Sequence, residues 1–165
     1  MNTAQGQLIS KIQPALGLLA TEAIKRLDNE DLLSVVRLTH HKMEVIGQKP
    51  ILSEDEAVLS LKQYYAMPIL FPEKKELAVS SVVDAYWHNH LLNTKGYRKF
   101  CEAVYGRFMD HVPLDKSDKL ETERVTSLYT ETRGMLAETF GQHVSEKAYP
   151  LKATADIVIC TYDYD

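Results

Sequence analysis

The sequence predicts an all-α protein, built as a single compact domain of about six helices. Apolar residues recur at steps of three and four along most of the chain, which is the spacing of one face of an α-helix. The 165 residues can enclose one hydrophobic core but not two well-packed ones. We therefore expect residues 1–165 to form one helical domain, with a central antiparallel pair of helices.

The first three helices are predicted from apolar stripes and from residues that begin or end helices. A stripe over residues 8–24 marks the first helix, and Asp28 is placed to cap the start of the second. The third begins at Ser53, because Ser53 and Glu56 form a capping box in which each side chain accepts a backbone N–H. We expect Pro68, Phe71 and Pro72 to terminate it, since proline interrupts a helix.

The fourth and fifth helices form the predicted central pair. The fourth runs from about Ser80 to Leu92, and the fifth from Thr94 or Gly96 to Met109. Helices joined by so short a connection usually pack antiparallel. Residues near the start of the fifth helix should therefore lie close to those near the end of the fourth.

A sixth helix and a separate C-terminal segment complete the chain. The helix is expected from about Ser117 to Phe140, with Gly141 suited to ending it. Residues 155–160 are mostly β-branched and apolar, and acidic residues follow them. We expect residues 155–165 to form a short strand, with no obvious partner, or a flexible acidic tail.

Composition excludes several function classes. The formal net charge is −4 and the isoelectric point is about 5.9, which disfavours binding to the phosphates of a nucleic acid. Two cysteines, Cys101 and Cys160, are too few for a disulfide framework. No apolar run reaches the roughly 20 residues of a membrane-spanning helix. These observations predict a cytoplasmic protein that binds neither nucleic acid nor membrane.

Residues with chemical potential gather between the fourth helix and the end of the fifth. This segment holds the only tryptophan, three of the six histidines and one of the two cysteines. Imidazole and thiolate are the usual ligands of zinc and other late first-row metals, and a carboxylate can complete such a set. We therefore predict a zinc or iron site here. Its candidate ligands are Asp84, His88, His90, Cys101 and His111; with Trp87 they are called the Trp–His cluster below.

Helical spacing indicates which of these candidate ligands can bind the same ion. Asp84 and His88 are four residues apart and share a helix face, whereas His88 and His90 point to opposite sides. In the antiparallel pair, Cys101 falls close to the position facing His88. The sharpest set is therefore Asp84, His88 and Cys101, and His90 and His111 join it only if the backbone is irregular.

The same residues also fit a purely structural role. A tryptophan and a histidine on a helix with apolar neighbours are typical of a core with internal hydrogen bonds, and Cys101 then serves as a small buried apolar side chain. On this interpretation the protein is a helical interaction module. It would bind an unidentified protein partner through a surface groove or its acidic tail. On the metal interpretation, an open coordination position would make the ion a Lewis acid, and a closed one would make it structural.

The motifs of this region carry a resemblance to a known family. Val83-Asp84 and Trp87-His88-x-His90, followed by Cys101, Gly106-x-Phe108 and His111-x-Pro113, resemble the glycine-rich domain-containing protein-like family. The resemblance covers roughly residues 55–114 and implies a compact helical domain with a histidine-based site. It implies no particular reaction. This chain departs from the family at Asp110, where members often carry a histidine, and lacks the downstream Gly- or Cys-rich sequence of many members.

Overall fold

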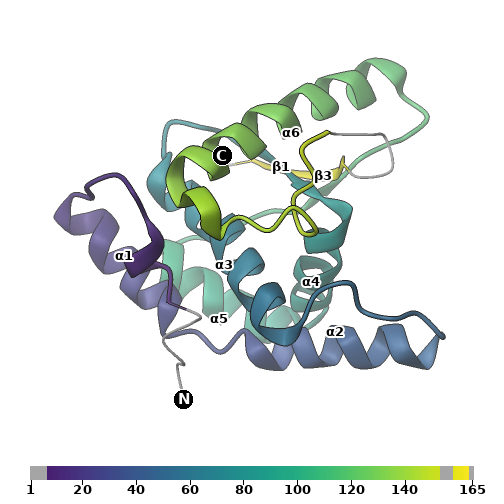
Figure 1. Cartoon of the computed structure of the whole chain (residues 1–165), viewed down its shortest axis with the longest axis horizontal. Coiled ribbons are helices and arrows are strands. Elements are labelled where there is room, and N and C mark those ends of the chain that lie inside the picture. The colour runs from purple at the N-terminus through teal and green to yellow at the C-terminus, as the bar shows by residue number, and fades with distance from the viewer. Residues whose placement is uncertain (1–6, 153–157, 164–165) are drawn as a thin grey trace.

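The computed structural model describes residues 7–152 and the backbone of residues 158–163. The predicted all-α class with about six helices is confirmed, and the described residues add a small antiparallel sheet (Figure 1). None of the helices in these ranges is long and apolar enough to cross a membrane. The α-helices are α1 Leu18–Asp28, α2 Leu33–Val45, α3 Glu54–Leu70, α4 Ser81–Leu92, α5 Thr94–Tyr105 and α6 Lys119–Phe140, with 3-10 turns η2 Ile9–Lys11 and η3 Gly141–His143.

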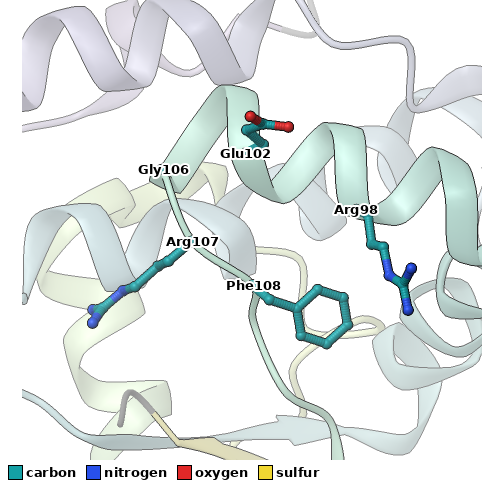
Figure 2. A pocket seen from close by; sticks show the side chains of 5 residues that line it. All are labelled: Arg98, Glu102, Gly106, Arg107 and Phe108. Atoms are coloured by element: carbon teal, nitrogen blue, oxygen red, sulfur yellow. The ribbon is translucent and has the colours of Figure 1, made fainter.

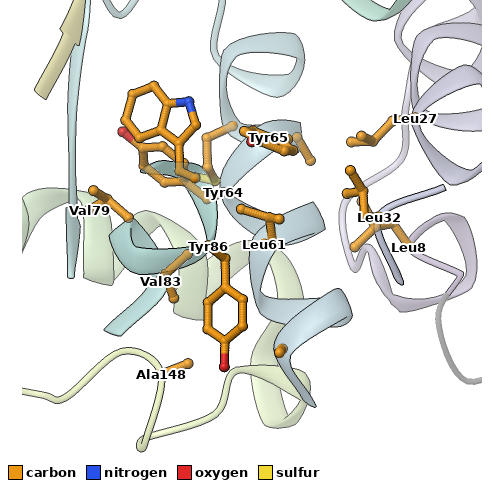
Figure 3. Packing of buried hydrophobic residues seen from close by; sticks show 14 of the residues in the cluster. Leu8, Leu27, Leu32, Leu61, Tyr64, Tyr65, Val79, Val83, Tyr86 and Ala148 are labelled. Atoms are coloured by element: carbon orange, nitrogen blue, oxygen red, sulfur yellow. The ribbon is translucent and has the colours of Figure 1, made fainter. Parts of the chain in front are cut away.

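Helix α3 is the centre of the core. It begins with the predicted capping box, in which Ser53 Oγ accepts the N–H of Glu56 at 3.2 Å and the Glu56 carboxylate accepts the N–H of Ser53 at 2.9 Å. Most of its remaining residues are buried, because α1, α2, α4 and α6 all pack against it. Figure 3 shows Leu61 and Tyr64 of this helix between two groups of apolar side chains.

Several helix ends differ from their predicted positions. Helix α1 begins only at Leu18, and the apolar residues before it belong to an irregular segment that includes η2. Helix α3, in contrast, ends at Leu70, between the predicted terminating residues Pro68 and Phe71, with Pro68 inside its last turn. Helix α5 ends at Tyr105 rather than at Met109, because Gly106 adopts the left-handed conformation, with φ of 70°, that commonly ends a helix.

The sheet was the main feature not foreseen. Strands β1 Glu76–Ser80, β2 Val112–Pro113 and β3 Val158–Asp163 are antiparallel, with β3 in the middle. Of the two alternatives for the C-terminal segment, the described part adopts the strand; residues 155–157 and 164–165 lie outside the described ranges. Helix α6 packs along β1 and β3, and α4 also contacts both strands.

Helices α4 and α5 follow one another with Asn93 between them, and they pack together as the predicted central pair. Asn93 Oδ1 accepts the N–H of Gly96 at 3.1 Å and so caps the start of α5. Helix α4 begins directly after β1, and Ser80 Oγ caps it by accepting the N–H of Val83 at 3.2 Å. The sheet and the helix pair are thus joined at the first residue of α4.

A buried ion pair connects the N-terminal segment to α1 and α3. Asp28 is the last residue of α1 rather than the cap of α2, and its carboxylate accepts the N–H of Leu8 at 2.8 Å and of Ile9 at 3.2 Å. Lys62 Nζ donates to the Asp28 carbonyl at 3.1 Å and lies 3.6 Å from its carboxylate. Burial lowers the pKa of Lys62, and the charge of Asp28 opposes this shift.

This arrangement predicts a large effect of one substitution. Asp28→Ala is expected to lower the free energy of unfolding by about 3–5 kcal/mol, because it leaves a buried ammonium without its carboxylate. Urea denaturation measures the change. The matched control is Glu22→Ala, which breaks the exposed ion pair with Lys25 and is expected to cost less than about 1 kcal/mol. Equal losses in the two variants would contradict the assigned role of Asp28.

Candidate functional site

The Trp–His cluster comes from three parts of the fold. Helix α4 supplies Asp84, Trp87, His88 and His90, and α5 supplies Cys101. His111 lies directly before β2, whose pairing with β3 fixes the position of this loop beside α4. Sheet pairing between residues far apart in the sequence thus decides which side chains meet.

Asp84 and His111 form a direct pair. His111 Nε2 lies 2.8 Å from Asp84 Oδ1, and the two side chains are 10% and 7% exposed. The His111 ring packs edge-on against Trp87, with 4.5 Å between ring centroids, and 5.9 Å separates its centroid from that of His88. His88 itself is exposed, so the group opens to solvent on one side. Asp84, His88 and His111 are therefore the part of the cluster that the structure brings together.

His90 lies on the opposite side of α4, in the core, as the helical spacing predicts. Its Nδ1 lies 2.8 Å from the hydroxyl of Tyr65, and its ring packs edge-on against Tyr97 and Phe100. Desolvation lowers the pKa of His90 to about 4. At neutral pH this imidazole is therefore uncharged and occupied by a hydrogen bond to α3.

Cys101 is buried with partners of its own. The backbone of Met109 and the hydroxyl of Tyr97 act to lower the pKa of its thiol, but burial outweighs them. Burial raises the pKa of the Cys101 thiol, so the thiolate that binds a metal or attacks a substrate is disfavoured. The carboxylate of Asp84, predicted to share a ligand set with Cys101, is paired with His111 instead.

Two tyrosines that were not predicted to take part, Tyr97 and Tyr65, complete the cluster. Trp87 Nε1 donates to the hydroxyl of Tyr97 at 3.1 Å, and that hydroxyl donates to the carbonyl of Met109 at 2.9 Å. Tyr65, the partner of His90, is fully buried as well. Burial raises the pKa of both tyrosines, which remain neutral donors. Two signals were available: Tyr97 belongs to the motif that follows Trp87-His88-x-His90, and a buried indole or imidazole needs a hydrogen-bond partner, for which nine tyrosines were candidates.

Metal coordination stays a prediction. Across residues 7–152, no three His, Cys, Asp or Glu side chains are arranged to hold an ion together. Two imidazoles, His88 and His111, with Asp84 beside one of them, are the nearest approach to a site. A carboxylate that orients a histidine is the usual companion of a metal-binding imidazole, so the pair has part of the required chemistry.

The fold and the cluster define a small helical protein with a buried aromatic and histidine network. The chain belongs to the family described as UCP032817-like, whose model matches residues 30–129. This range includes the whole Trp–His cluster and α2 to α5. No curated protein and no solved structure matches the chain. The resemblance to the glycine-rich domain-containing protein-like family remains a prediction from its motifs.

The low pKa of His90 predicts a specific response to acid. The unfolded chain has a histidine pKa of about 6.5, so it binds more protons than the folded chain as the pH falls from there toward 4. The contribution of His90 to stability should therefore be complete above pH 6.5 and fall by roughly 2 kcal/mol between pH 7 and pH 5.

Urea denaturation of the wild type and of His90→Asn at several pH values tests this response. Asparagine retains a polar group near the position of Nδ1 but does not titrate. The stability difference between the two proteins should shrink as the pH falls. A difference that is constant from pH 7 to pH 5 would mean that His90 is not buried in its neutral form.

Proposed function

We propose that this protein is a helical protein-interaction module in which the Trp–His cluster is a structural polar network. The observation that carries the proposal is the hydrogen-bond chain from Trp87 through Tyr97 to the Met109 carbonyl, with His90 bonded to Tyr65 beside it. These groups satisfy one another inside the core. Such a network fixes the relative positions of α3, α4, α5 and the loop before β2.

The completeness of the network supports an architectural role. Within the described residues, the buried side-chain nitrogen or oxygen atom without a hydrogen-bond partner is Gln63 Oε1, outside the cluster. Catalytic groups, in contrast, are usually directed at a substrate position and are poised to exchange protons there. The raised pKa of Cys101 argues in the same direction, since it keeps the thiol protonated.

A zinc or iron site is the second candidate, and one observation favours it. The rings of His88 and His111 lie 5.9 Å apart, at the side of the cluster that opens to solvent, and Asp84 bonds to His111. An ion there would use two imidazoles and, at most, the neighbouring carboxylate. His90 and Cys101 would remain parts of the buried network in either case.

A stability measurement and a metal titration distinguish these two functions. Tyr97→Phe is expected to lower the free energy of unfolding by about 1–3 kcal/mol, because the Trp87 N–H and the Met109 carbonyl lose a buried partner. Isothermal titration of the metal-free wild type with zinc, and with ferrous iron under argon, should show no stoichiometric site.

His88→Ala, His111→Ala and the exposed control His41→Ala complete the design. If one equivalent of metal binds, and binding is lost in the first two variants but kept in the control, the second candidate replaces the proposal. If Tyr97→Phe leaves the stability unchanged, the network is not a structural requirement and the proposal is also wrong.

A further inference from the structure

An open groove lies between α1, the end of α3 and the end of α5. Its volume is about 370 Å³, and Ala23, Ile69 and Val104 contribute to its apolar lining. Leu19 lines the same groove and is 87% exposed, and its neighbour Leu18 is 77% exposed. Large apolar side chains so close to a hollow lined by apolar residues are typical of a surface that a partner covers.

Arginines give this surface a positive charge. Arg26 and Arg107 line the groove, and a second hollow of about 420 Å³ shares Arg107 and adds Arg98. Figure 2 shows the ring of Phe108 between the side chains of Arg98 and Arg107. The one carboxylate in the two linings is Glu102. Three arginines therefore concentrate here on a chain whose net charge is −4.

One of these arginines is held in position by the fold. Arg26 Nε donates to the carbonyl of Ala103 at 3.1 Å, which places the guanidinium between α1 and α5 at the side of the groove. A positioned guanidinium loses less conformational entropy on binding a carboxylate than a freely rotating side chain does. The groove therefore offers an apolar floor together with one preorganised guanidinium, that of Arg26, as a partner for an anion.

We propose that this surface binds a short acidic segment of another protein, an amphipathic helix whose apolar side chains enter the groove and whose carboxylates pair with Arg26, Arg98 and Arg107. The inference rests on the proposed function and names the chemistry of its partner. Apolar anchors suit the floor, and arginine recognises carboxylates by paired hydrogen bonds. A nucleic-acid backbone would leave the exposed leucines without an apolar contact.

A designed peptide tests the proposal on the full chain. The probe is a fluorescein-labelled helix of about four turns, with leucines on one face and glutamates elsewhere. Two control peptides replace the glutamates by lysines or the leucines by serines. Fluorescence anisotropy should detect binding of the acidic leucine peptide alone, and the affinity should fall as salt rises, because salt screens the arginines.

Matched variants localise the binding. Leu19→Ser and Arg107→Glu should each lower the affinity for the acidic peptide by about tenfold or more. Leu120→Ser and Lys116→Glu, at exposed positions on α6 and before it, should leave the affinity unchanged. Thermal unfolding of each variant checks that the fold is retained, which is expected because Leu19 and Arg107 are exposed.

Three results would overturn this inference. The first is that the lysine peptide binds as tightly as the acidic peptide. The second is that Leu19→Ser and Leu120→Ser lower the affinity for the acidic peptide equally. The third is that the wild type dimerises in sedimentation and Leu19→Ser abolishes the dimer. The last result would assign the groove to a second copy of the chain. Failure at the groove is distinct from failure of the proposed function, because a metal lost in His88→Ala overturns that function whatever the peptide does.

Discussion

The indole N–H of Trp87 must find a hydrogen-bond acceptor in the core, and much of the fold is arranged around the way it does so. Trp87 is fully buried, and an unpaired donor there would cost about 1–3 kcal/mol. The hydroxyl of Tyr97 in α5 accepts this bond and donates its own hydrogen bond to the Met109 carbonyl in the loop that leads to β2. These two bonds connect α4 to α5 and α5 to the chain that follows it. Tyr65 and His90 make the corresponding connection between α3 and α4.

The central strand β3 provides the second constraint. It joins β1, which leads directly into α4, to β2, which follows His111. The pair formed by Asp84 and His111 therefore depends on both the helix and the sheet. The surface proposed to bind a partner lies at the ends of α3 and α5 and along α1, so the core network can hold its walls in place without taking part in binding.

Local signals predicted the features that depend on neighbouring residues. The capping box at Ser53 is present, the helices around Asn93 form a pair, and His88 and His90 point to opposite sides of α4, because helix caps and helix faces are set within a few residues. Strand β1 was not predicted because it is short and because its backbone hydrogen bonds are made with β3, which is far away in the sequence. The partner of Asp84 could not be predicted for the same reason, since the position of His111 depends on β2 and β3.

The side-chain hydrogen of Trp87 offers the most direct measurement. Trp87 is the only tryptophan, so its indole N–H gives a single resonance in an ¹⁵N correlation spectrum. If the network is architecture, this proton should exchange with solvent only through global unfolding, with a free energy of exchange equal to that found by urea denaturation. Added zinc should leave the resonance unmoved. Rapid exchange in the folded protein, or a stoichiometric shift on adding zinc, would contradict the structural role assigned to the Trp–His cluster.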